Sequence, residues 1–126
     1  MFITSETFTY AGNHLLLDVW GAKFLDNHDQ LLSILTKAVL ESNATVLGNN
    51  FHSFPDNGVT GVITLAESHI SIHTWPKADL ATIDIFMCGN SSPNLAVDYI
   101  LKHLQPSRSE LVTVKRALTE VRNEDA

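Results

Sequence analysis

Hydrophobic and polar positions along the chain follow the periods of both strands and helices. Residues 14–20 (HLLLDVW) are mostly apolar and rich in strand-forming side chains, which predicts a strand. After a polar break at 26–29, apolar residues recur near the helical period. This pattern predicts an amphipathic helix over about 28–42 that is capped by Asp26 or Asn27 and packs one face on a sheet.

The rest of the chain is predicted to contain one more helix and several strands. Ser92 and Pro93 begin a second helical pattern that continues to Leu104. The turn-rich PDNG at 55–58 ends one arm of a hairpin. Period-two alternation and runs of strand formers predict strands over 44–47, 58–65, 68–75, 81–87 and 110–118.

These elements predict an α/β (α+β) two-layer sandwich, in the order β-α-β-β-β-α-β. Two helices are too few to cover both faces of a sheet, so we expect a mainly antiparallel sheet with the helices on one face. The other face would be partly exposed, and we expect a second copy of the chain to cover some of it. Residues 1–126 are expected to form one domain, with only the tail NEDA disordered.

Composition narrows the classes of function. A single cysteine excludes an internal disulfide and a cysteine-rich zinc module, which favours a reducing, cytoplasmic setting. No stretch approaches the length of a membrane span. The net charge of −6 argues against nucleic acid and favours a cationic small molecule. The acidity is uneven, because residues 1–67 carry seven acidic and two basic side chains.

Side chains that are capable of chemistry gather between positions 51 and 88. On a strand of period two, a single histidine is as often an exposed or hydrogen-bonded surface residue as a functional one, so the grouping matters more than any member. The group consists of Phe51, His52, Phe54, Thr60, Glu67, Ser68, His69, His73, Trp75 and Cys88.

Several kinds of site compete for these residues. His69 and His73 have the i, i+4 spacing of a helical zinc site, but their segment is strand-like and lacks the glutamate of H-E-x-x-H, so we predict no metal. A serine hydrolase favours an elbow such as G-x-S-x-G, whereas Ser68 lies in A-E-S-H. Cys88 with His73 is compatible with thiol chemistry, although spacing alone does not require it.

The run GVTGVITLAESHISIHTWP, followed by IDIFMCG, resembles the processing and active-site signature of the short prokaryotic S-adenosylmethionine decarboxylases. Members of that family are made as proenzymes and use a pyruvoyl group. The resemblance extends more loosely over most of the chain, through GNHLLLDVW at 12–20, ESNATV at 41–46 and Phe51-His52. It implies the family's α/β sandwich, a cytoplasmic decarboxylase of polyamine and spermidine biosynthesis, and a homodimer of cleaved protomers.

The resemblance implies that the chain cleaves itself between Glu67 and Ser68 into residues 1–67 and 68–126. The Ser68 hydroxyl would attack the Glu67 carbonyl, and the resulting ester would leave by β-elimination. Hydrolysis of the dehydroalanine would then leave a pyruvoyl group. His73 is implied as the proton donor or base of this processing, and Thr60 takes the place of a serine that assists it in the family. Because Ser68 and His73 are five positions apart, a regular strand would point them to opposite faces. We therefore expect a bend near 67–69, or a strand that starts after Ser68.

In turnover, the resemblance implies a Schiff base between the pyruvoyl group and the substrate amine, with Cys88 returning a proton to the α-carbon. The implied substrate-binding positions are Phe54, which stacks the adenine in the family, and Trp75, Lys77 and Asp79. Lys77 stands where the family has a glutamate that holds the ribose hydroxyls. A carboxylate accepts hydrogen bonds from hydroxyls, whereas an ammonium only donates.

Three functions therefore stay open. S-adenosylmethionine is the default substrate of a pyruvoyl-dependent decarboxylase, and ornithine or arginine is the alternative, with Asp79 or Asp84 available for the distal cation. The third is a non-catalytic, uncleaved partner protein. The retention of Ser68, His73 and Cys88 argues against it.

Overall fold

The computed structural model describes residues 2–5 and 7–121, so the NEDA tail lies outside the described residues. A sheet of six antiparallel strands forms its main layer, in the order β4-β5-β6-β7-β3-β8. Its strands are β3 (Gly12–Trp20), β4 (Val46–Ser53), β5 (Val59–Leu65), β6 (Ser68–Trp75), β7 (Leu80–Met87) and β8 (Arg108–Arg116).

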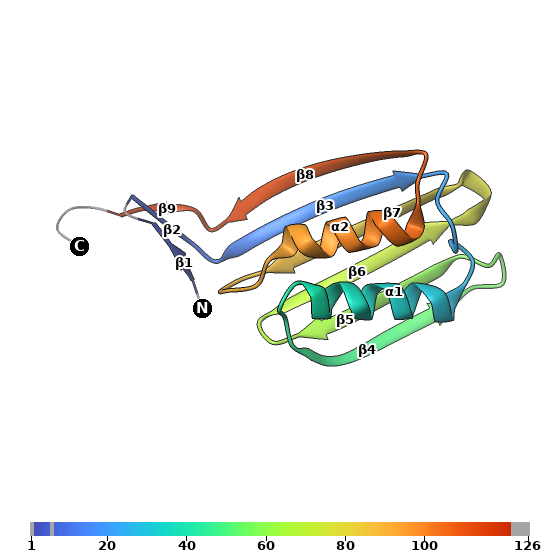
Figure 1. The fold of residues 1–126 in the computed structure, drawn as a ribbon, viewed down its shortest axis with the longest axis horizontal. Coiled ribbons are helices and arrows are strands. Elements are labelled where there is room, and N and C mark those ends of the chain that lie inside the picture. Colours follow the sequence, from blue (N-terminus) through green and yellow to red (C-terminus); the bar gives the residue numbers. More distant parts are fainter. Residues whose placement is uncertain (1, 6, 122–126) are drawn as a thin grey trace.

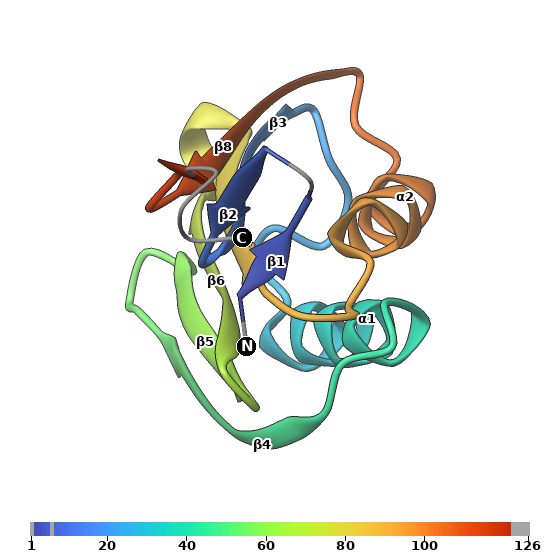
Figure 2. The ribbon, with the colours of Figure 1, turned by 90° about the vertical axis from the view of Figure 1, so that its left-hand side faces the viewer.

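Two helices, α1 (His28–Glu41) and α2 (Pro93–Leu104), form the second layer and lie on the same face of the sheet (Figures 1 and 2). Asn27 caps α1, because its side chain accepts a hydrogen bond from the backbone N–H of Gln30 at 3.1 Å. Pro93 begins α2, where its missing N–H costs no helical hydrogen bond.

Alternate strand residues and the apolar stripes of the helices meet between the two layers. On β3, Leu15, Leu17 and Val19 are buried, and the same alternation continues on β5, β6 and β7. This single apolar layer fixes which residues of each strand point to the helices and which point to the open face, because side chains alternate along a strand.

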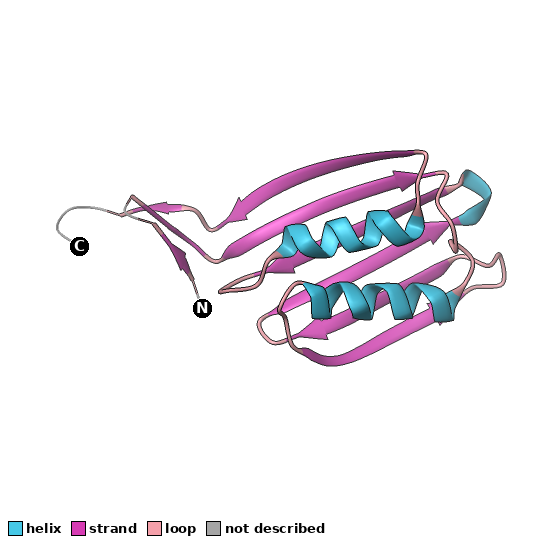
Figure 3. Cartoon of the chain, viewed as in Figure 1, coloured by secondary structure: helices cyan, strands magenta, loops and turns pink. Residues whose placement is uncertain are grey.

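A second, smaller sheet extends beyond the end of the main one. It consists of β1 (Ile3–Thr4), β2 (Phe8–Tyr10) and β9 (Thr119–Glu120) and projects from the end where β3 begins and β8 ends (Figures 1 and 3). Ala117, with φ of 57°, turns the chain from β8 toward β9. The sequence patterns did not predict this sheet.

The predicted two-layer sandwich, with a mainly antiparallel sheet and both helices on one face, is confirmed. The predicted order β-α-β-β-β-α-β is one strand short, since four strands, β4 to β7, lie between the helices. Strand β4 also runs to Ser53, beyond the predicted end at 47. The prediction stopped early because most residues of β4 are exposed and several are polar, so the strand has no clear alternation of apolar and polar positions. Neither α1 nor α2, the helices of the described residues, is long and apolar enough to cross a membrane.

Candidate active site

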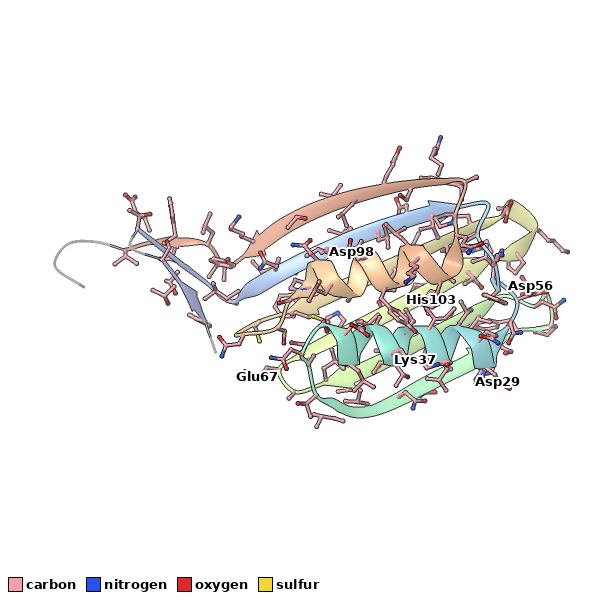
Figure 4. All side chains as sticks on the ribbon, in the orientation of Figure 1. Asp29, Lys37, Asp56, Glu67, Asp98 and His103 are labelled. Atoms are coloured by element: carbon pink, nitrogen blue, oxygen red, sulfur yellow. The ribbon has the colours of Figure 1, made fainter. Side chains whose placement is uncertain are left out.

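The turn between β5 and β6 holds Glu67 at one end of the main sheet (Figure 4). Only Ala66 and Glu67 connect the two strands, so the backbone reverses within two residues. Glu67 has a φ of 60°, in the left-handed region that side chains other than glycine adopt at a cost. The backbone is therefore strained at the residue that precedes Ser68.

Ser68, Cys88 and the Glu67 carbonyl converge at this turn. Cys88 follows directly after β7, which pairs with β6, and its Sγ lies 3.8 Å from the Ser68 Oγ. The Cys88 Sγ–H donates to the Glu67 carbonyl oxygen at 3.2 Å, and the Cys88 backbone N–H lies 3.4 Å from the Ser68 Oγ. Ser68 is only 9% exposed. A hydroxyl, a thiol and a polarised carbonyl thus surround the Glu67–Ser68 peptide bond.

The Glu67 carboxylate adds a negative charge beside this group. The chain's positive amino terminus holds the pKa of this carboxyl below its usual value, with a smaller contribution from the hydrogen bond that Cys88 donates. The carboxyl therefore stays ionised at neutral pH.

A pocket of about 460 Å³ opens beside Ser68. It is lined by Ala11, His14, Glu67, Ser68, His69, Phe86, Arg116 and Ala117. His14 Nε2 lies 3.0 Å from Asp84 Oδ1, and Arg116 Nη1 lies 3.5 Å from His14 Nδ1. Phe86 contacts the rings of both His14 and His69.

Sequence patterns alone did not single out His14, Phe86 or Arg116 as site residues. Each became part of the pocket through strand pairing: His14 faces Phe86 across β3 and β7. Arg116 pairs with Gly12 on the other side of β3. The only signal available in the sequence was the inclusion of His14 and Phe86 in the segments that carry the resemblance.

His73 does not reach Ser68 within one chain. The β5–β6 ladder is regular from Leu65↔Ser68 to Thr60↔His73, and Ser68 shares the buried face with Ile70 and Ile72, so His73 lies on the open face. Five strand residues separate them by about 16 Å. The turn at Ala66 and Glu67 ends before β6, which starts at Ser68 itself and runs without a bend to His73, so the expected rearrangement that would bring Ser68 and His73 to one face is not present.

His73 instead pairs with Thr60, whose Oγ1 lies 3.2 Å from His73 Nδ1. Both residues line a pocket of about 410 Å³ with Phe54 and Trp75, toward the sheet end that Asp56 marks in Figure 4. Phe54 is 45% and Trp75 47% exposed. The structure therefore gathers the predicted residues into two groups at opposite ends of the sheet.

Lys77 and Asp79 lie just beyond Trp75. Lys77 is exposed within a single 3₁₀ turn, Pro76–Ala78, and lines a small pocket with Asp56 and Trp75. Asp79 is also exposed, has a φ of 52°, and uses its backbone carbonyl to accept from the N–H of Gly21. Within residues 2–5 and 7–121, no group of three or more His, Cys, Asp or Glu side chains is placed to bind a metal ion.

Comparison with known proteins gives consistent matches. The family model of S-adenosylmethionine decarboxylase matches residues 13–117. A protein of Aquifex aeolicus named S-adenosylmethionine decarboxylase proenzyme is 40% identical over 112 residues, which cover 86% of this chain and 83% of the relative. A protein of the same name from Methanococcus maripaludis is 39% identical over 113 residues, covering 87% and 93%.

A solved structure supports the same relationship. The crystal structure of the adenosylmethionine decarboxylase from Aquifex aeolicus superposes with a TM-score of 0.81 at 35% sequence identity. The match covers 90% of this chain and 97% of that one.

Proposed function

The chain belongs to the S-adenosylmethionine decarboxylase family, whose members are pyruvoyl-dependent carboxy-lyases, and we propose that it is a self-processing decarboxylase of this kind. It would be made as a proenzyme, cleave itself between Glu67 and Ser68, and act in the cytoplasm on a small cationic amino acid. The convergence of the Ser68 hydroxyl, the Cys88 thiol and the Glu67 carbonyl at one strained turn is the observation that carries this proposal.

Processing uses groups that already lie at the turn. The Ser68 Oγ attacks the Glu67 carbonyl carbon, the C–N bond breaks, and an ester with a free Ser68 amine results. The hydrogen bond from Cys88 Sγ polarises that carbonyl before the attack. Removal of the Ser68 α-proton then expels Glu67 as a carboxylate that keeps the former Oγ. Water hydrolyses the remaining dehydroalanine, and ammonia is released.

The pyruvoyl group that follows from Ser68 supplies an electrophilic carbonyl, which binds the substrate amine and accepts the electrons that carbon dioxide leaves behind. The surroundings of Ser68 suit this chemistry. The residue is buried, which excludes water, and the Cys88 thiol lies 3.8 Å from its Oγ, where it can return a proton to the substrate α-carbon.

Mass spectrometry of the denatured protein tests the processing. We expect two fragments, residues 1–67 and 68–126, with a pyruvoyl mass at the start of the second. An intact chain of 13.9 kDa after prolonged incubation would overturn the proposal.

S-adenosylmethionine is the proposed substrate, and Phe54 and Trp75 support it. Two aromatic side chains that line one pocket and are nearly half exposed offer a surface on which an adenine can stack. Lys77 favours a second candidate, ornithine or arginine, because its ammonium cannot accept hydrogen bonds from ribose hydroxyls and these two amino acids have no ribose. Release of carbon dioxide from the three amino acids, measured in parallel, decides between them.

A homodimer is part of the proposal, because one chain holds the two groups of site residues far apart. The open face carries the Thr60–His73 pair together with exposed apolar residues of β3 and β8, namely Leu16, Val112 and Val114. A second copy packed on this face would cover them and could bring its own His73 to Ser68. Sedimentation of the cleaved protein at the mass of a monomer would contradict the dimer.

A further inference from the structure

Arg116 is the one lysine or arginine among the described residues that line the pocket beside Ser68. It lies at the end of β8, exposed to solvent, and no carboxylate of the described part of the chain forms an ion pair with it. Its polar side-chain contact is His14 Nδ1, at 3.5 Å. A guanidinium that has no carboxylate partner and faces a pocket is suited to bind an anion.

His14 fixes the direction of that guanidinium. Its Nε2 donates to the Asp84 carboxylate at 3.0 Å, which leaves Nδ1 as the acceptor for an Arg116 N–H. The Phe86 ring packs edge-on against the imidazole. Asp84, His14 and Arg116 come from three adjacent strands, β7, β3 and β8, so the sheet itself holds the row together.

Arg116 and residue 68 line the same pocket from opposite sides of strands β7 and β3. Strands β6 and β8 are separated by β7 and β3, so their backbones lie about 14 Å apart. The Arg116 side chain spans part of that distance from one side. An amino acid held through its amine at residue 68 carries its α-carboxylate one carbon from that amine, so the carboxylate extends from residue 68 into the pocket that Arg116 lines.

We propose that Arg116, held by the Asp84–His14 pair, binds the α-carboxylate of the substrate. This assignment rests on the proposed function, since it needs an amino-acid substrate attached at residue 68. Arg116 acts on binding and orientation. Negative charge leaves the carboxylate as carbon dioxide forms, so a cation stabilises the bound substrate at least as strongly as the transition state, and its loss raises KM without lowering kcat.

The test compares Arg116→Gln with wild-type enzyme on two ligands that differ only in the carboxylate. These are the amino acid that the wild type decarboxylates, S-adenosylmethionine first, and the corresponding decarboxylated amine used as an inhibitor. Loss of charge-assisted hydrogen bonds should raise KM by about 10- to 100-fold. The kcat should stay within about threefold, and the inhibition constant of the amine should not change. Arg116→Lys should give an intermediate KM.

Lys115→Gln is the matched control. Lys115 is the neighbour of Arg116 on β8, carries the same charge, and does not line the pocket. Its removal should leave KM unchanged. Equal increases in KM for Lys115→Gln and Arg116→Gln would show a general effect of positive charge and would overturn the assignment.

The positioning role of His14 has its own readout. His14→Ala should raise KM in the wild type but not in the Arg116→Gln background, because its effect passes through the guanidinium. Additive effects would overturn the positioning role.

The failures of the two proposals are distinguishable. A wild-type chain that stays uncleaved, or that releases no carbon dioxide from S-adenosylmethionine, ornithine or arginine, overturns the proposed function and this inference together. A cleaved, active Arg116→Gln enzyme with an unchanged KM overturns the inference alone. So does one in which the KM of the amino acid and the inhibition constant of the amine rise by the same factor.

Discussion

The two ends of strand β6 are built for different tasks. At the Ser68 end, the Cys88 thiol lies 3.8 Å from the buried Ser68 hydroxyl and 3.2 Å from the Glu67 carbonyl oxygen, beside a strained turn. At the other end, His73 and Thr60 form a hydrogen-bonded pair on the open face, beside the half-exposed Trp75. The Ser68 end holds the Glu67–Ser68 peptide bond that the proposed processing cleaves. The other end holds a pair suited to proton transfer that lies far from this bond. The proposed dimer would join these two groups of residues into one site.

Two inactive variants should complement each other if this comparison is right. Ser68→Ala alone should stay uncleaved and lose all activity, because it has no hydroxyl. His73→Ala alone should cleave at least 100-fold more slowly, because it lacks the processing base. In a mixture, a His73→Ala chain can use the intact His73 of a Ser68→Ala partner, so the His73→Ala chain should be cleaved. Differently tagged chains, co-expressed and weighed by mass spectrometry, report which one was cut.

His103→Ala serves as the control for this experiment. His103 lies on α2 (Figure 4), away from the open face, and stacks on Tyr99. Chains with this substitution should cleave by themselves. If the mixed Ser68→Ala and His73→Ala chains both stay intact, His73 does not act across a dimer.

Replacing Cys88 sharpens the comparison by separating the two reactions of the Ser68 end. Cys88→Ala should still cleave, because the attacking hydroxyl is intact, but decarboxylation should fall by about 100-fold or more through loss of the proton donor. The decarboxylation rate of Cys88→Ser should lie between those of the wild type and Cys88→Ala, since the serine hydroxyl can donate a proton but is a weaker acid than the thiol. Carbon dioxide release per pyruvoyl group measures the effect. An unchanged rate in Cys88→Ala would remove the thiol from the mechanism.

Most of the fold could be predicted from local patterns. The period of the apolar residues placed α1 and α2 within a residue or two, and Asn27 was among the predicted caps. Strands β6 and β7 followed from alternation because each has one buried face. The small β1–β2–β9 sheet escaped prediction because its strands are two or three residues long and have no buried stripe.

The candidate site could be predicted only in part, for a related reason. Glu67, Ser68 and Cys88 lie in the segments that carry the resemblance, and the structure brings them together. His14 lies 70 positions from Asp84 and 102 from Arg116, so only the β3–β7 and β3–β8 pairings reveal that they form one row. The sequence spacing of Ser68 and His73 correctly raised the question of opposite faces, but the answer required the regular β5–β6 ladder.

Lys77 tests whether the end of the sheet that holds His73 and Trp75 selects the substrate. Lys77→Glu restores the residue type that the resemblance assigns to ribose binding. It should lower the KM for S-adenosylmethionine by about 10-fold, because a carboxylate accepts hydroxyl hydrogen bonds and attracts the sulfonium. Lys77→Gln controls for the loss of positive charge and should give a smaller change. A KM for S-adenosylmethionine that is unchanged or higher in Lys77→Glu would show that residue 77 does not hold the ribose hydroxyls.

Substitution of Thr60 should give the smallest effect at the His73 end of the sheet. Its Oγ1 lies 3.2 Å from His73 Nδ1, and its extra methyl group, compared with serine, restricts the hydroxyl to few rotamers on the strand. Thr60→Ser keeps the hydroxyl and frees its rotation, so self-cleavage should become about two- to fivefold faster. Thr64→Ser, on the same face of β5 and opposite His69, removes an equivalent methyl group without touching the His73 pair and should cleave at the wild-type rate. The fraction of cleaved chain over time, followed after synthesis in a cell-free system, measures both. Slower cleavage in Thr60→Ser would mean that the methyl group holds the hydroxyl in its working position.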